Sequence, residues 1–185
     1  MLFKDKSKNA AIPKEETPEE KPSLKGLLID LVEVVGTALV LTFVLLIFIQ
    51  PSIVDGRSMF PTLHDNDKLL LWKLGDIDRN DIVVFDSHDM ENNKYVKRVI
   101  GIAGDEIIIK DSTVTVNGTP LNETYINEPD FNGDLSLTVP EDEIFVLGDN
   151  RNHSNDSRAF GTVKLDDVDG KMIFNLNGWI RSVFH

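Results

Sequence analysis

Residues 27–49 read LLIDLVEVVGTALVLTFVLLIFI and divide the chain into a polar tail, an apolar segment and a larger C-terminal domain. Residues 34–49 contain no charged side chain. Sixteen helical residues span about 24 Å, less than a hydrocarbon core of about 30 Å, so the helix must also include residues near Ile29. A stretch that is hydrophobic on all sides predicts one transmembrane helix, which we place at residues 27–50.

The tail, residues 1–26, decides between two interpretations of the apolar segment. A cleaved signal peptide has a shorter region before its apolar run and a small-x-small pattern after it, and neither is found here, so we expect a retained anchor. The tail is rich in Lys, Glu and Pro, which predicts disorder. Lys21 and Lys25 precede the segment and Arg57 follows it, which favours a cytoplasmic tail and an extracytoplasmic domain at residues 51–185.

The domain after residue 50 contains short runs of β-branched and aromatic residues between turn signals, which predicts a mostly β, antiparallel domain. Asn117-Gly118 is a strong hairpin signal. One short helical turn is expected near residues 165–168, and no longer helix is predicted in this domain. The predicted strands are residues 69–72, 82–85, 95–100, 107–109, 113–116, 135–139, 144–147 and 172–174.

Composition excludes several classes of site. The chain has no cysteine, so disulfides and thiolate metal sites are excluded. Residues 51–185 carry 13 Lys and Arg against 24 Asp and Glu, a formal net charge of −11. An acidic surface repels phosphate backbones, so no nucleic-acid partner is expected. His64-Asp65 and His88-Asp89 have no third ligand nearby in sequence, and we expect neither a metal nor another cofactor.

Ser58 is the candidate nucleophile because it lies in GRSMFPT, residues 56–62, nine residues after the apolar segment. A serine on such a turn beside a membrane suggests a serine hydrolase, although similar strings also occur by chance in solvated loops. The serine needs a base to accept its proton. His153 is one candidate, in a triad of Ser58, His153 and Asp156, although a solvent-facing loop histidine is the commoner case.

Lys97 is the better base on physical grounds. Strand alternation in residues 95–100 puts Tyr95, Lys97 and Val99 on one face of the strand. Arg98 belongs to the other face, so we expect Lys97 to point inward and Arg98 to stay in water. Burial lowers the pKa of a lysine and leaves a neutral amine that can accept a proton. An edge-strand lysine that discourages aggregation is the commoner use of this residue, and the nearby nucleophile is what favours a base.

Three stretches and the apolar segment together resemble a known family. GRSMFPT, YVKRVIGIAGD at residues 95–105 and GDNRNHSNDSR at residues 148–158 occur in the order and with the character of the boxes of type I bacterial signal peptidases, peptidase family S26, especially the short Gram-positive type. The likeness covers most of the chain from about residue 27. It implies a membrane-anchored serine endopeptidase with an antiparallel β Ser/Lys fold, which removes signal peptides from secretory preproteins after a small-x-small segment.

The resemblance also implies roles for individual residues. Ser58 is similar to the family nucleophile and Lys97 to its general base, acting through an acyl-enzyme. Ser154 aligns with a serine whose hydroxyl orients the lysine. Asp156 and Arg158 align with an ion pair that supports the site.

The oxyanion is expected to bind the backbone N–H of Ser58. Gram-negative relatives often carry a serine where this chain has Gly56, so the second donor is left unassigned. The preprotein should lie extended and pair with strands through its backbone. The lining of its pocket is expected to be Val54, Met59, Leu63, Tyr95 and Val96. Membrane lipid is a further expected partner, and we expect a monomer.

Two alternatives were considered for this pattern. A related Ser/Lys peptidase of the self-cleaving repressor kind is disfavoured by the anchor and by the lack of a DNA-binding segment. A catalytically silent relative that assists the assembly of surface proteins would be expected to lack the serine or the lysine. This chain has both Ser58 and Lys97.

Overall fold

The computed structural model describes residues 23–87 and 93–184. The chain forms two compact units, Met1–Leu41 and Thr42–His185, which are described separately. Most of the tail predicted to be disordered, residues 1–22, lies outside the described residues.

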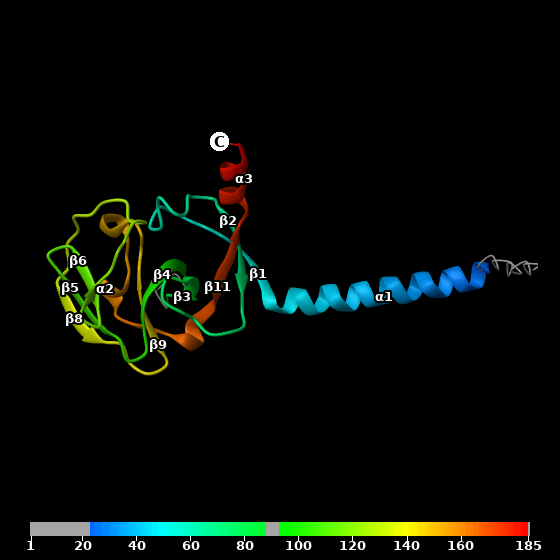
Figure 1. Ribbon diagram of the computed structural model, residues 1–185, viewed down its shortest axis with the longest axis horizontal. Coiled ribbons are helices and arrows are strands. Elements are labelled where there is room, and N and C mark those ends of the chain that lie inside the picture. Colours follow the sequence, from blue (N-terminus) through cyan, green and yellow to red (C-terminus); the bar gives the residue numbers. More distant parts are fainter. Residues whose placement is uncertain (1–22, 88–92, 185) are drawn as a thin grey trace, which may run out of the picture. The chain divides into compact units, whose positions relative to one another are not determined.

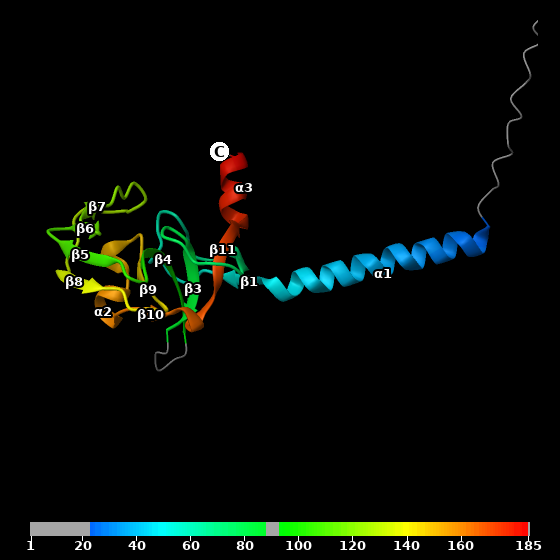
Figure 2. The same ribbon diagram turned by 60° about the horizontal axis from the view of Figure 1, so that its bottom comes forward.

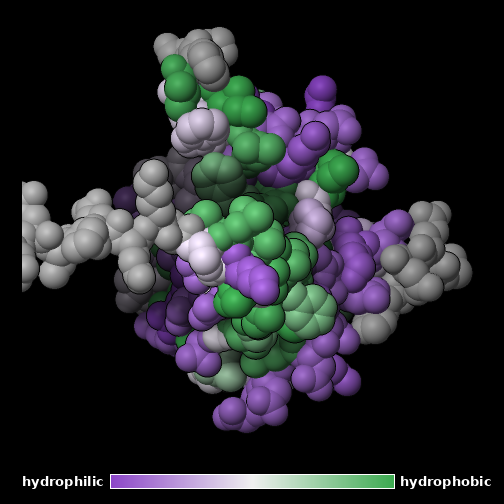
Figure 3. Space-filling model, turned by 90° about the vertical axis from the view of Figure 1, so that its right-hand side faces the viewer, coloured by the Kyte–Doolittle hydropathy of each residue, from purple (hydrophilic) through white to green (hydrophobic). Residues whose placement is uncertain are grey.

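Helix α1 runs from Leu24 to Phe48 and is continuous in both ribbon views (Figures 1 and 2). Its 25 residues are long and apolar enough to cross a membrane, with a length of about 37 Å. Apart from Phe48, which is partly buried, the large apolar side chains of α1 are 42–76% exposed, and Figure 3 shows hydrophobic residues gathered on the face that it displays. The predicted helix at residues 27–50 extends two residues beyond Phe48, where α1 ends. Ile49 and Gln50 already belong to a strand, because Pro51 disfavours a helical conformation in the residue before it.

A seven-stranded antiparallel sheet forms the main part of the second unit, in the order β1-β2-β11-β3-β4-β9-β10. Strands β3, β4 and β9 lie in its middle and are buried along most of their length. This burial explains why β3 and β9 are mostly apolar, whereas β4 also carries the buried cations Lys97 and Arg98. The strands are β1 (Ile49–Ile53), β2 (Lys68–Trp72), β3 (Ile82–Asp86), β4 (Lys94–Ile102), β9 (Glu143–Leu147), β10 (Val163–Lys164) and β11 (Val168–Asn175).

A four-stranded antiparallel sheet, in the order β7-β6-β5-β8, lies at the other end of this unit from β1 (Figure 2). Its strands are β5 (Glu106–Lys110), β6 (Thr113–Val116), β7 (Thr119–Pro120) and β8 (Leu135–Thr138). The predicted Asn117-Gly118 hairpin turn is confirmed, with φ of 50° and 76°, the positive values that a tight hairpin requires. Ile107 and Val114 of this sheet share a core with Phe145 of the larger one.

The predicted strands are all present, and the short 3-10 helix η2 (Leu165–Asp167) lies at the predicted helical turn. The expectation of no longer helix was wrong, because α3 spans Leu176–Phe184. Nine residues are too short a stretch for helical periodicity to identify, and Gly178 lowers the helix propensity of the segment. Tertiary contacts stabilise α3 instead, through two hydrogen bonds from the guanidinium of Arg181 to Asp67, at 2.7 and 2.8 Å. The remaining helical pieces are η1 (Arg151–His153) and α2 (Ser157–Phe160).

Candidate active site

Ser58 lies in the turn that follows β1, and local contacts fix this turn. Gly56 has φ of +87°. Residues that carry a side chain rarely adopt this left-handed backbone conformation. The N–H of Gly56 donates to Oδ1 of Asp65 at 2.9 Å. The turn therefore reverses sharply just before Ser58 and leaves its hydroxyl partly exposed.

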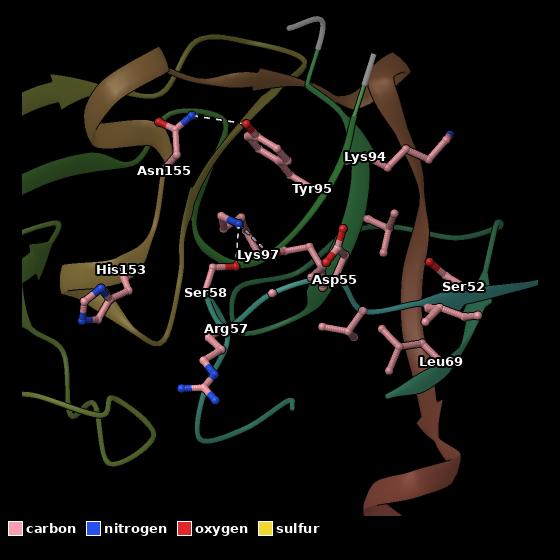
Figure 4. A pocket seen from close by; sticks show the side chains of 15 residues that line it. Ser52, Asp55, Arg57, Ser58, Leu69, Lys94, Tyr95, Lys97, His153 and Asn155 are labelled. Atoms are coloured by element: carbon pink, nitrogen blue, oxygen red, sulfur yellow. Dashed lines mark hydrogen bonds between the residues drawn. The ribbon is translucent and has the colours of Figure 1, made fainter. Parts of the chain in front are cut away.

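Lys97 reaches Ser58 from the middle of β4, as Figure 4 shows. Its Nζ lies 2.9 Å from Ser58 Oγ and 3.0 Å from the carbonyl oxygen of Val96. The residue is only 3% exposed, and its Nζ lies 5.0 Å from the centre of the Tyr95 ring. Burial lowers the pKa of Lys97 to about 8, against a smaller opposing effect of the Asp156 charge. Two groups 39 positions apart are thus within proton-transfer distance.

The expectation that Arg98 stays in water was wrong. Arg98 is buried, and its guanidinium binds both carboxylate oxygens of Asp149, at 2.8 and 2.7 Å. It also stacks 4.0 Å from the centre of the Tyr125 ring. Burial would lower the pKa of Arg98, but the bonds with Asp149 outweigh that effect and raise it. Both faces of β4 are covered by protein, so alternation alone could not predict which cation is solvated.

The segment 148–158 lies against the Ser58 turn and is held by Asp156. This carboxylate caps α2 and accepts from the N–H of Gly148 at 3.1 Å. It also forms an ion pair with Arg158 at 2.8 Å. A Cβ at Gly148 would lie 2.2 Å from Ser154 Oγ, so only glycine fits there.

Ser154 does not make its expected contact in the described part of the chain, where its buried Oγ has no hydrogen-bond partner. Its role in orienting the lysine therefore stays a prediction. His153 is exposed and lies at the edge of the pocket. Among the described residues, the hydrogen bond of Ser58 Oγ is with Lys97 rather than with His153, and the Asp156 carboxylate binds Gly148 and Arg158. The geometry favours the lysine as base.

A pocket of about 300 Å³ opens beside Ser58 (Figure 4). The predicted lining residues Val54, Tyr95 and Val96 are part of its wall. Met59 and Leu63 are instead 1% exposed and belong to the core behind it. They are one helical turn apart, with the N–H of Leu63 donating to the carbonyl of Met59 at 2.8 Å, which turns both inward.

Sequence reasoning missed several residues of this wall. The pocket is lined by Ser52, Ile53, Val54, Asp55, Gly56, Arg57, Ser58, Leu69, Val84, Lys94, Tyr95, Val96, Lys97, His153 and Asn155. Ser52 and Ile53 were given no role in the sequence analysis, and Leu69 and Val84 were recognised only as strand residues. Alternation identifies the face of a strand but not what lies opposite it.

The chain as a whole is similar to several known proteins. The family model described as "Signal peptidase, peptidase S26" matches residues 28–177. A signal peptidase I of Bacillus licheniformis is 38% identical over 174 residues, covering 85% of this chain and 93% of the relative. Signal peptidase IB of Staphylococcus aureus is 34% identical over 185 residues, covering 87% and 94%. A crystal structure of a signal peptidase I from Enterococcus faecalis V583 is 36% identical, with a TM-score of 0.48, and covers 53% of this chain and 97% of that chain.

Proposed function

The chain belongs to the peptidase S26 family of signal peptidases and is a serine peptidase of the signal peptidase I type, and we propose that Ser58 and Lys97 form its catalytic dyad. The substrates are secretory preproteins, and we propose that the chain cuts them after a small-x-small segment. The observation that carries the proposal is the 2.9 Å distance between Lys97 Nζ and Ser58 Oγ at a buried lysine.

In the proposed mechanism, the neutral amine of Lys97 takes the proton of Ser58 as Oγ attacks the scissile carbonyl carbon. The resulting oxyanion accepts a hydrogen bond from the backbone N–H of Ser58. The C–N bond then breaks, and the ammonium of Lys97 gives its proton to the leaving nitrogen. Lys97 next removes a proton from a water molecule, whose oxygen attacks the acyl carbon. As the ester bond breaks, the ammonium of Lys97 returns that proton to Ser58 Oγ, and both groups regain their starting states.

The neighbouring residues support this chemistry. We propose that Asp156 and Arg158 hold segment 148–158 in place, since their ion pair also fixes the N–H of Gly148. The negative charge of Asp156 opposes the lowering of the Lys97 pKa, so this charge does not help to keep the lysine neutral. We therefore propose that Asp156 acts by positioning the segment rather than as a base. Residues before the cut would lie in the pocket against Val54, Tyr95 and Val96, because this pocket opens beside Ser58.

We propose that α1 anchors the chain in the lipid bilayer, with residues 1–26 in the cytoplasm and residues 51–185 outside. Exposed apolar side chains along the 25 residues of α1 support the anchor, and Lys21 and Lys25 support the orientation. The enzyme would act as a monomer, because both members of the dyad come from one chain.

Cleavage of a preprotein in detergent micelles tests the dyad. Ser58→Ala and Lys97→Ala should each lower the rate by about 10³-fold or more, because each removes a group that the chemistry requires. Lys110→Ala removes an exposed lysine of β5 and should leave the rate unchanged. A Lys97→Ala enzyme of near-normal rate would contradict the dyad. An unmodified chain that cleaves no preprotein would instead favour the catalytically silent assembly factor.

A further inference from the structure

Asn150 makes two hydrogen bonds to the turn that carries Ser58. Its side-chain Nδ2 donates to the carbonyl oxygen of Arg57 at 3.1 Å. Its backbone N–H donates to the carbonyl oxygen of Ser58 at 2.9 Å. Asn150 is 5% exposed, so these bonds are shielded from water. Two successive carbonyl groups of the nucleophile turn are therefore held toward segment 148–158.

The bond to Arg57, together with the one that the N–H of Phe60 donates to the same carbonyl oxygen at 3.1 Å, also fixes the direction of the Ser58 N–H. The carbonyl of Arg57 and the N–H of Ser58 belong to one trans peptide group and point in opposite directions. A carbonyl held toward Asn150 thus turns the N–H of Ser58 away from it. Among residues 23–87 and 93–184, none accepts a hydrogen bond from this N–H. It is free to bind a developing oxyanion.

The residue before Arg57 supplies no oxyanion donor, so the orientation of the Ser58 N–H is critical. Gly56 has no side-chain donor, and its own N–H is already bound to Asp65. If the peptide between Arg57 and Ser58 rotated, its carbonyl oxygen would point toward the reacting carbonyl. The negative end of a dipole would then face the negative charge of the transition state.

The side chain of Asn150 is bound through its donor end. Its Oδ1 is buried and has no partner in the described part of the chain. A buried acceptor without a partner destabilises the fold. The segment also approaches closely at Gly148, where a Cβ would lie 2.6 Å from the Ser58 carbonyl oxygen. Segment 148–158 therefore packs against the carbonyl side of the Ser58 turn.

We infer that Asn150 is a positioning residue, whose carboxamide presents the N–H of Ser58 to the oxyanion. This inference rests on the proposed function and adds to it a cause for the orientation of the oxyanion donor. Asn150 does not contact Lys97 in the described structure, so it acts on stabilisation of charge rather than on proton transfer.

The test compares full-length Asn150→Asp and Asn150→Ala enzymes with the unmodified enzyme in detergent micelles. Both variants lose the Nδ2 donor and keep the backbone N–H. Rates are taken at the alkaline plateau, so that a changed lysine pKa does not affect them. The kcat for a peptide substrate should fall 10- to 100-fold, somewhat less than complete loss of an oxyanion donor, with KM within threefold. Affinity for a peptide aldehyde, which forms a tetrahedral adduct with Ser58, should fall in parallel, while affinity for the matched peptide alcohol stays unchanged.

Asn152→Asp is the matched control, because it introduces the same charge two residues away on an exposed side chain that binds Glu128 and Asp130. A kcat within threefold of normal in the Asn150 variants, or a loss confined to KM, would overturn the inference. So would unchanged aldehyde affinity. If the variants do not fold, the Ser58 amide proton of the unmodified enzyme should move downfield in NMR spectra on aldehyde binding, and an unmoved resonance overturns it. Failure of the unmodified enzyme to cleave would refute the proposed function instead.

Discussion

The burial of Lys97 has a cost that its proposed role as a base would explain. Its pKa is lowered from 10.5 to about 8 by burial, and one pKa unit corresponds to about 1.4 kcal/mol between the two protonation states. The sequence predicted this buried lysine from Tyr95 and Val99 on the same strand face. It could not predict that Arg98 is buried as well, since Asp149 and Tyr125 come from distant segments.

The lowered pKa of Lys97 predicts the pH dependence of activity. The protonated lysine cannot accept a proton from Ser58, so kcat/KM should rise about tenfold per pH unit below the pKa and level off above it. With a pKa of about 8, the rise should fall between pH 5 and 8. Peptide cleavage measured with enzyme shown to be folded at each pH checks this. A flat profile from pH 5 to 9 would rule out a lysine base.

One tertiary ion pair, between Arg181 and Asp67, stabilises helix α3. Burial alone would raise the pKa of Asp67, but hydrogen bonds, first that from Arg181, lower it from 3.8 to about 2. A carboxyl group with a lowered folded-state pKa stabilises the fold above its unfolded value. That stabilisation is lost as the pH falls from about 4 to 2, so the contribution of this pair is full at neutral pH.

Arg181→Ala should therefore lower the free energy of unfolding by about 1–3 kcal/mol at pH 7, because it removes two hydrogen bonds from a buried carboxylate. The deficit should shrink at pH 3, where Asp67 begins to gain a proton. Urea unfolding in micelles, followed by tryptophan fluorescence, measures both values. Lys164→Ala removes one positive charge from an exposed residue and is the control. Equal losses in the two variants would contradict a specific role for the Arg181 pair.

Elements were predictable where local sequence determines them. Asn117-Gly118 marks its own turn because both residues tolerate positive φ. The amphipathic helix α3 and the strand β1 were missed, because one depends on Asp67 and the other begins inside the apolar run. Neither α3 nor β1 is marked by a signal in its own local sequence.

At the scale of the whole molecule, the site is assembled from β4, the turn after β1 and segment 148–158. Motifs predicted the members, Ser58 and Lys97, but not their 2.9 Å separation. That separation depends on the strand order, in which β4 pairs with β9 just before Gly148. Met59 and Leu63 lie in the core rather than the pocket because the helical turn between them directs both side chains inward.

The proposed topology can be tested because the chain has no cysteine, so single introduced cysteines can be labelled without background. With Lys21 and Lys25 before α1, the positive charges should stay in the cytoplasm. A membrane-impermeant maleimide should label Lys110→Cys, at the exposed end of β5, in intact cells with the outer surface accessible. Ser7→Cys should be labelled only after permeabilisation, and Thr37→Cys, within α1, should react poorly in both cases. The reverse pattern would place the dyad in the cytoplasm, where preproteins have not yet crossed the membrane, and would contradict both the orientation and the proposed place of cleavage.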